Sequence, residues 1–391
     1  MIAIRAAHIL TPFDHLAPGI LTIRDGKIDA VFPDSGQPLE GMEVIDAHGC
    51  TLGPGLIDVH THGIGGLEVV DGAEGRMAGI AEQYARHGVT AFLAGVGGSP
   101  QHIHNGIRIA RRYHKSAAAA APHGAELLGI HLEGPFINPA RSGAFPLETI
   151  LAPDAPLLRQ YLKMAGGLIR LITLAPELPG ALKLIRLARA AGVIVSAGHS
   201  QATYEEMMTA VEAGLSHATH TFNAMPALHH RAPGILGAVL ADERITAEII
   251  ADGIHVHPAV VRLFLRSKTP ARSVLISDSI AAAGLPDGDY LFEGLDIRVE
   301  EGCARLADGT LAGSISSLEK GLANLVRWGG LTLAQAFQTA STTPADELGV
   351  GDRKGRLAPG YDADILCLDS QLNVQWCMAR GVRYFPPPHT G

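Results

Sequence analysis

Residues 55–62 read Gly55-Leu-Ile-Asp-Val-His-Thr-His62, and this stretch decides the fold. The apolar run predicts a short buried strand that ends in two histidines. A glycine-rich loop at this point would favour an open, doubly wound sheet that binds a phosphate. The strand ends in a His-Thr-His sequence instead, which favours a closed barrel with its polar site at the strand ends.

Seven further apolar runs follow, at residues 90–94, 127–130, 168–172, 193–196, 217–219, 247–250 and 273–277. Helical patterns separate most of them, at residues 78–87, 181–191 and 203–213. The last helix is predicted to begin at a capping box formed by Thr203 and Glu206 and to stop at Gly214. Eight strand–helix units predict an α/β fold, a TIM-like (β/α)8 barrel over residues 54–345.

Both ends of the chain carry short strand patterns without helical periodicity. Residues 20–24 and 27–32 flank Asp25-Gly26, which predicts a hairpin, and residues 364–368 and 374–378 are short apolar runs. We therefore expect residues 1–53 and 346–391 to pair in one small β-sandwich domain beside the barrel.

Composition excludes several classes of function. The chain has 391 residues, a net charge of -8 and no lysine- or arginine-rich run, which argues against nucleic-acid or anionic-membrane partners. No signal-peptide pattern and no apolar stretch of membrane-spanning length are present. The four cysteines are scattered, without a CxxC pair, as in reduced proteins. These features predict a cytoplasmic protein that acts on a small molecule.

Imidazole and carboxylate groups fall at the ends of five of the predicted strands. They are His60, His62, Glu133, His199, His220 and Asp278. Because barrel enzymes build their sites at the C-terminal rim, these groups are expected to converge. A set without thiolates suits one or two catalytic divalent ions, zinc foremost, with iron, manganese or cobalt as alternatives. Such an ion acidifies water, and Asp278 can transfer the proton, so the pattern predicts a metal-dependent hydrolase.

Other histidines lack this placement at strand ends. A lone histidine near a strand end is more often a hydrogen-bonded structural residue than a ligand. We therefore expect the remaining candidates to be surface residues, namely His102, His104, His114, His123 and His217.

Several longer motifs carry a family resemblance. They include Pro54-Gly-Leu-Ile-Asp-Val-His-Thr-His-Gly63, His131-Leu-Glu-Gly-Pro-Phe-Ile137 and Ala218-Thr-His-Thr-Phe-Asn-Ala-Met-Pro226. On these motifs the chain resembles the amidohydrolase superfamily, and within it the N-acetylglucosamine-6-phosphate deacetylases. The resemblance covers nearly the whole chain and implies a homodimer that hydrolyses the amide of an N-acetyl amino sugar phosphate to the amine and acetate.

The resemblance also implies roles for individual residues. It implies Glu133, His199 and His220 as ligands of a principal metal, His60 and His62 as ligands of a second metal, and Asp278 as the catalytic acid/base. It implies Asn223, the backbone N–H of Ala224, and Arg231 as phosphate contacts, and His255 as a substrate contact. An arginine suits this task because its guanidinium can hold a phosphate with two hydrogen bonds.

Phe145, Ser316, and Ser279 with Ile280 depart from the family's pattern near the substrate, and the departure at Phe145 matters most. Phe145 stands where the family usually has a histidine, and phenylalanine cannot donate a hydrogen bond. Three alternatives therefore stay open beside the N-acetylglucosamine 6-phosphate reading: the galactosamine epimer, a different N-acyl amine, and a barrel without catalysis.

Overall fold

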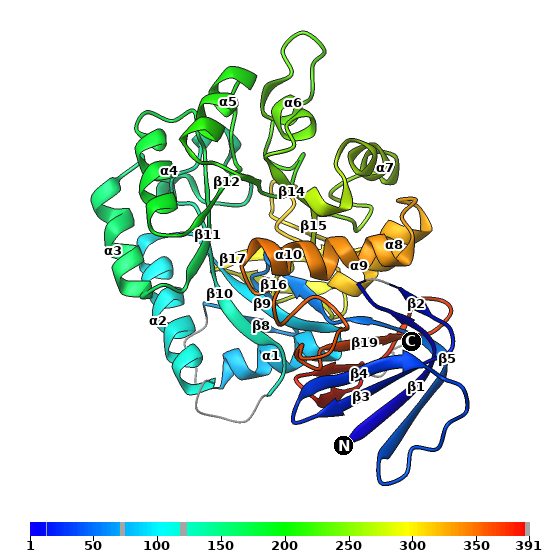
Figure 1. Ribbon diagram of the computed structural model, residues 1–391. Helices are drawn as coiled ribbons and strands as arrows, with labels where there is room; N and C mark the ends of the chain where they lie inside the picture. The colour runs from blue at the N-terminus through cyan, green and yellow to red at the C-terminus, as the bar shows by residue number, and fades with distance from the viewer. Residues whose placement is uncertain (13, 71–74, 118–122, 388–391) are drawn as a thin grey trace.

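The computed structural model describes residues 1–12, 14–70, 75–117 and 123–387. Its centre is a parallel sheet of eight strands, in the order β15-β14-β13-β12-β11-β10-β9-β6 (Figure 1). The strands are β6 (Leu56–Asp58), β9 (Val89–Val96), β10 (Glu126–Glu133), β11 (Ile169–Leu174), β12 (Ile194–Ala197), β13 (His217–Ala218), β14 (Thr246–Ile250) and β15 (Ser273–Ile276). Each predicted apolar run forms one of these strands, so the eight-stranded (β/α)8 prediction is confirmed.

The sheet closes on itself just beyond the ends of its first and last strands. Asp278 donates its backbone N–H to the carbonyl of His60 at 2.9 Å, and His62 donates to the carbonyl of Ser279 at 2.7 Å. Thr61 and Ser279 form a parallel bridge there. Closure therefore joins the strand that carries His60 and His62 to the strand that carries Asp278.

Helices surround the barrel, and their apolar faces bury against the strands (Figure 1). The α-helices are α1 (Arg76–Arg86), α2 (Pro100–Ala117), α3 (Ala155–Ala165), α4 (Ala181–Ala190), α5 (Tyr204–Ala213), α6 (Gly234–Ala241), α7 (Pro258–Ser267), α8 (Leu318–Arg327), α9 (Leu333–Phe337) and α10 (Thr343–Glu347), with a π-helical turn at Gln338–Thr342 and 3₁₀ turns at Pro139–Arg141, Leu147–Thr149 and Pro270–Arg272. Helix α5 has the predicted capping box, in which Thr203 and Glu206 exchange hydrogen bonds, and it ends at Gly214 with a φ of 113°.

The two ends of the chain share one sheet, in which the blue N-terminal and red C-terminal strands lie side by side in Figure 1. Its strands are β1 (Ile2–Leu10), β2 (His15–Leu16), β3 (Gly19–Arg24), β4 (Lys27–Pro33), β5 (Glu43–Pro54), β19 (Ile365–Leu368), β20 (Val374–Ala379) and β21 (Val382–Tyr384). The predicted hairpin is β3–β4, whose turn residues Asp25 and Gly26 both have positive φ. The division into residues 1–53 with 346–391 and residues 54–345 stays a prediction.

A buried ion-pair cluster ties this sheet to the barrel. Lys354 is fully buried, and its Nζ lies 3.0 Å from Glu126 at the start of β10 and 2.7 Å from Asp364, which precedes β19. Arg353 contacts the same Glu126 at 2.6 Å. These groups are distant in sequence, so no local pattern predicts the cluster.

A small antiparallel sheet between β15 and α8 was not predicted. It consists of β16 (Gly288–Phe292), β17 (Leu295–Glu300) and β18 (Cys303–Arg305), and a two-stranded ribbon, β7 (Gly63–Ile64) with β8 (Leu67–Glu68), precedes α1. The backbone N–H of Glu293, in the β16–β17 turn, donates to the carboxylate of Glu68 at 2.9 Å. These additions place extra side chains over the C-terminal rim of the barrel.

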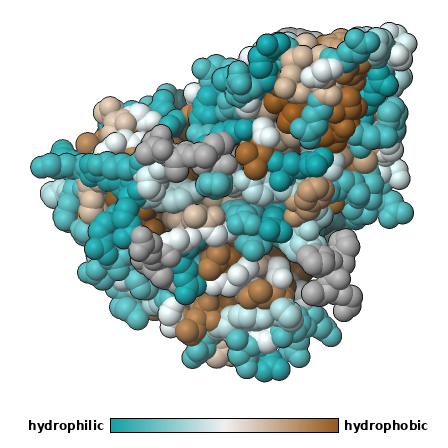
Figure 2. Space-filling view, turned by 90° about the horizontal axis from the view of Figure 1, so that it is seen from below, coloured by the Kyte–Doolittle hydropathy of each residue, from teal (hydrophilic) through white to brown (hydrophobic). Residues whose placement is uncertain are grey.

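The face in Figure 2 is mostly hydrophilic, and its hydrophobic residues gather in a few separate patches. None of the described helices is both long and apolar enough to span a membrane. The largest hydrophobic cluster is internal and lies between the barrel strands and the surrounding helices.

Candidate metal centre at the barrel rim

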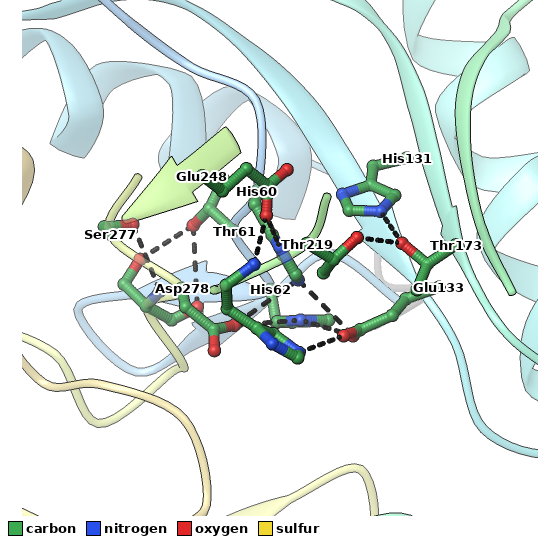
Figure 3. Close-up of polar contacts among 12 residues, drawn as sticks. His60, Thr61, His62, His131, Glu133, Thr173, Thr219, Glu248, Ser277 and Asp278 are labelled. Carbon is green, nitrogen blue, oxygen red and sulfur yellow. Dashed lines mark hydrogen bonds and ion pairs between the residues drawn. The ribbon is translucent and has the colours of Figure 1, made fainter. Parts of the chain in front are cut away.

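Glu133, the last residue of β10, lies at the centre of the site. Its Oε1 is 3.3 Å from Nε2 of His199 and 3.2 Å from Nε2 of His220. Its Oε2 is 3.4 Å from Nε2 of His60 and 3.2 Å from Nε2 of His62. One carboxylate therefore faces two pairs of imidazoles, one pair at each oxygen. Figure 3 shows Glu133 with the pair formed by His60 and His62.

The spacing of these atoms fits divalent metal ions. Two ligands held about 2.0–2.1 Å from one ion at tetrahedral angles lie roughly 3.3–3.4 Å apart. The donor atoms of Glu133, His199 and His220 form one compact group, and those of His60, His62 and Glu133 form another. Nε2 of His60 is buried and has no hydrogen-bond partner among the described residues, as expected for an atom that ligates an ion.

Asp278 completes the rim beside the second group. Its Oδ1 lies 3.5 Å from Nε2 of His60 and 3.4 Å from Nε2 of His62. Burial raises the pKa of this carboxyl, but the charge of His60 and a hydrogen bond from His62 outweigh burial and lower it. Asp278 is therefore an ionised carboxylate, the state that a proton acceptor needs.

The charges of the cluster support one another. Burial alone lowers the pKa of His62, but hydrogen bonds to Asp278 and Glu133 raise it to about 10. Burial opposes ionisation of Glu133 as well, yet the charge of His60 and bonds from His199 and His220 hold its pKa well below the usual value. An arrangement of ionised carboxylates and protonated imidazoles is one in which a cation can take the place of the protons.

A third group of potential ligands, His60, His131 and Glu248, does not fit an ion. Both ring nitrogens of His131 are engaged, Nδ1 with the carbonyl of Val59 at 3.2 Å and Nε2 with the hydroxyl of Thr173 at 2.7 Å. Burial and the charge of His60 lower the pKa of His131 to about 3. His131 is therefore a neutral packing residue.

The backbone at the strand ends is unusual. His199, His220 and Asp278 have φ values of 49°, 28° and 49°, in the left-handed region that side chains disfavour. Such conformations persist where the surroundings over-determine them, and they cluster at functional sites. Gly95 allows the close packing of this rim, because a Cβ there would lie 2.6 Å from the carbonyl oxygen of Thr61.

A cavity of about 440 Å³ opens onto the centre. Its lining combines rim residues with the three-stranded sheet and the loop after β10: His62, Ser99, His102, Glu133, Ala144, Phe145, His199, His220, Asn223, Ala224, His255, Asp278, Phe292, Glu293, Leu295, Arg305 and Leu311 are among its members. This volume is within the range of small-molecule sites.

The lining of the cavity includes three of the predicted substrate contacts, Asn223, Ala224 and His255. Nδ1 of His255 lies 2.6 Å from Asp252, which fixes the ring. Ala224 follows His220 in the loop after β13 and has a φ of 53°. The structure therefore brings these three residues to the cavity, and their contacts with the substrate stay a prediction.

Arg231 lies elsewhere. It is exposed, its Nη1 is 2.7 Å from Nε2 of His230, and it is not among the residues that line the cavity. The structure thus does not bring Arg231 to the other predicted phosphate contacts of its own chain.

Phe145 forms part of the cavity wall, with its ring centroid 5.3 Å from that of His199 in an edge-on arrangement. Glu293 also lines the cavity. Its carboxylate is buried and 3.8 Å from Nδ1 of His62, and burial raises its pKa to about 7. The sequence analysis did not name Glu293, because it follows an exposed-looking strand pattern far from the rim motifs.

Two histidines were wrongly predicted to be surface residues. His217 is fully buried and hydrogen-bonded to Glu248, because its short strand starts inside the barrel. His102 is half-buried and lines the cavity, because α2 starts at the rim. The sequence does contain a signal for Glu248, because a carboxylate within the apolar run 247–250 has to be paired.

Comparisons with known proteins agree with this geometry. Residues 51–383 match the model of the amidohydrolase family. The chain is 37% identical to the N-acetylglucosamine-6-phosphate deacetylase of Bacillus subtilis, over 95% of this chain and 94% of the relative. It is 38% identical to the N-acetylgalactosamine-6-phosphate deacetylase of Escherichia coli O157:H7, over 97% and 98%.

Solved structures give the same result. A mutant N-acetyl-D-glucosamine-6-phosphate deacetylase from Mycobacterium smegmatis, in complex with N-acetyl-D-glucosamine-6-phosphate, superposes with a TM-score of 0.90 at 33% identity, over 98% of this chain and 99% of that one. The enzyme from Pasteurella multocida superposes with a TM-score of 0.91 at 30% identity, over 98% and 99%. The chain therefore belongs to the N-acetylglucosamine-6-phosphate deacetylase family of the amidohydrolases and is a hydrolase of amide C–N bonds.

Proposed function

We propose that this enzyme removes the acetyl group of N-acetylglucosamine 6-phosphate with the help of divalent metal ions, zinc foremost. The observation that carries the proposal is the position of Glu133 between two histidine pairs, with Asp278 at the edge of the same group. The relatives named above support the substrate, since their names or titles refer to this sugar phosphate or its galactosamine epimer.

We assign the residues as follows. Glu133, His199 and His220 would hold a principal ion, and His60 and His62 would hold a second ion with Glu133. Bound ions would polarise the amide carbonyl and acidify a water molecule.

Asp278 would accept the proton of that water and deliver it to the amine that leaves. The ionised state of its carboxyl, held by the charge of His60 and a hydrogen bond from His62, is the state that the first of these steps requires. Asn223, the backbone of Ala224, and His255, which line the cavity, would orient the sugar phosphate.

The role of Asp278 can be tested by substitution. Asp278→Asn keeps the shape of the side chain but removes its ability to accept a proton, so kcat should fall by about 10²- to 10⁴-fold. The content of bound metal should stay close to that of the wild type. An Asp278→Asn enzyme with wild-type kcat would contradict the assignment.

The galactosamine epimer is a second candidate substrate, because the relative that acts on it is as similar to this chain as the glucosamine relative. Phe145 lines the wall where the family usually has a histidine, so the sugar contacts here differ from the family's pattern. Measuring kcat/KM for both epimers with the same enzyme sample decides between them. The higher value identifies the substrate.

We also propose that the enzyme is a cytoplasmic homodimer. Cys367 and Cys377 are buried free thiols, which suits a reducing compartment. Arg231 lies outside its own cavity, on a loop that exposes Leu228 with 51% of its surface accessible. In the proposed dimer, a second copy covers this loop, and Arg231 contacts the phosphate of a substrate in the neighbouring cavity.

Mixing two variants with impaired activity tests this arrangement. If Arg231 acts across a dimer, Arg231→Ala and Asp278→Asn enzymes should recover activity when they are unfolded and refolded together. One subunit of the mixed dimer would then combine an intact Asp278 with an arginine from its neighbour. A monomer by light scattering, or no recovery in mixed dimers, would contradict the proposal.

A further inference from the structure

A buried chain of alternating histidines and carboxylates runs from the metal centre into the barrel. It starts at His60, whose Nδ1 lies 3.0 Å from Oε2 of Glu248 in β14. Oε1 of Glu248 lies 3.1 Å from Nε2 of His217, and Nδ1 of His217 lies 2.9 Å from Glu347 at the end of α10. Glu248, His217 and Glu347 have no part in the proposed function.

Glu248 is an expensive group to place where it is. Its side chain is fully buried, and an ionised carboxylate without partners in such a place costs several kcal/mol. Both of its oxygens are engaged, and Oε2 also accepts a hydrogen bond of 2.9 Å from the backbone N–H of His220. An apolar side chain would fill a barrel core at lower cost, so a function for the charge is the better explanation.

The contacts of Oε2 explain what the charge does. By accepting the proton of Nδ1, it fixes the tautomer of His60 and leaves Nε2 directed at Glu133 and Asp278 (Figure 3). The same oxygen holds the backbone of His220, which has the disfavoured φ of 28°. One oxygen atom thus orients a histidine of each group.

On the side away from the metal centre, His217 pairs with Glu248. Both ring nitrogens of His217 face carboxylates, so this imidazole donates in both directions and carries a positive charge. That charge compensates Glu248 without competing for His60. Glu347, the outer end of the chain, is partly exposed.

The other histidines of the centre are held differently. Nδ1 of His199 lies 2.8 Å from the backbone carbonyl of Arg141. Nδ1 of His62 and of His220 has no hydrogen-bond partner among the residues that the structure describes. A carboxylate hydrogen-bonded to the second ring nitrogen of a metal-bound histidine raises the basicity of the ring and fixes its orientation. Of these four histidines, His60 therefore has the strongest support for its ring.

We propose that Glu248 is a positioning residue of the metal centre, which orients the imidazole of His60 and the backbone of His220 for ion binding, with His217 and Glu347 as its support. The proposal rests on the proposed function, because it presupposes that ions bind at this rim. It predicts that loss of the Glu248 charge lowers the affinity for ions, in addition to any loss of fold stability.

Metal titration of the purified full-length enzyme tests the proposal. Metal-free samples would be titrated with Co²⁺ against a competing chelator, with the visible absorption of bound Co²⁺ as a second signal. Glu248→Gln should bind at least one ion about 10- to 100-fold more weakly than the wild type, with an altered Co²⁺ spectrum. The control is Glu319→Gln, since Glu319 also pairs with an imidazole, Nδ1 of His87 at 2.9 Å, outside the metal centre. The control should bind Co²⁺ like the wild type.

The outcomes separate the alternatives. Wild-type Co²⁺ affinity and spectrum in a folded Glu248→Gln enzyme, even with a lower melting temperature, would overturn the proposal and leave a structural role. If Glu248→Gln does not fold, His217→Gln decides: several-fold weaker Co²⁺ binding supports the proposal and unchanged binding overturns it. The wild type is measured first. A wild-type enzyme that binds no ion would refute the proposed function itself.

Discussion

Replacing Glu133 by glutamine should disrupt both ion sites at once. Each carboxylate oxygen faces one pair of histidines, Oε1 at 3.2–3.3 Å from His199 and His220, and Oε2 at 3.2–3.4 Å from His60 and His62. Glutamine keeps the shape of the side chain but has no charge and only one acceptor oxygen. One of the two groups therefore loses its oxygen ligand, and both lose the negative charge.

The size of the effect follows from burial. The Glu133 side chain is only 4% exposed, so little water can replace the lost contact. Removing one partner of a buried charged interaction costs about 3–5 kcal/mol. At about 1.4 kcal/mol for each factor of ten, ion affinity should fall roughly 100- to 4,000-fold.

Competition with a chelator for Zn²⁺, followed by elemental analysis, measures both the affinity and the number of ions. Circular dichroism would show that the Glu133→Gln barrel is folded, and Glu319→Gln again serves as the buried-carboxylate control. Retention of all the ions of the wild type at wild-type affinity by Glu133→Gln would refute the metal-centre assignment.

Three further predictions concern the substrate and the fold. Arg231→Ala should lower kcat/KM for the phosphorylated substrate about 10- to 100-fold, because a charge-assisted hydrogen bond contributes roughly 1.5–3 kcal/mol, whereas an unchanged kcat/KM would exclude it from phosphate binding. Phe145→Ala should enlarge the cavity and raise the ratio of activity on N-butanoyl to activity on N-acetyl substrate about tenfold, because each methylene in an apolar pocket contributes about 1–3 kcal/mol. An unchanged ratio would show that the acyl group binds elsewhere. Burial raises the pKa of Glu126, but hydrogen bonds from Arg353 and the charge of Lys354 lower it to about 2. Its stabilising effect is therefore present above pH 4.5 and is lost as the pH falls toward 2. The melting temperature of the metal-free wild type should be well above that of Glu126→Gln at pH 7, and the difference should be much smaller at pH 3. A difference that does not change with pH would contradict this.

The sequence predicted the parts of the fold that depend on local patterns. Each barrel strand is a short apolar run, because parallel strands are buried on both faces; Val89–Val96, for example, is entirely buried. The capping box at Thr203 and the turn at Asp25-Gly26 are likewise local signals. The six rim residues could be placed because the end of a strand fixes the end of the barrel at which its side chain lies.

Features that depend on contacts between distant segments were not predicted. The carboxylate of Glu248 touches His60, which is 188 positions away. Residues 288–305 form a separate sheet over the rim, and no periodicity in the sequence tells where such a sheet packs. The exposed position of Arg231 has the same cause, since motif similarity places a residue in a loop but not the loop in space.

The most direct test of the account is whether amide hydrolysis depends on the metal centre. Acetate release from N-acetylglucosamine 6-phosphate and from its galactosamine epimer would be measured with enzyme stripped by a chelator, and again after Zn²⁺ is added back. We predict no release from the stripped enzyme, and release from at least one epimer after one or two ions per chain are restored. Undiminished release from the stripped enzyme, or none from the fully loaded enzyme with either epimer, would contradict the account.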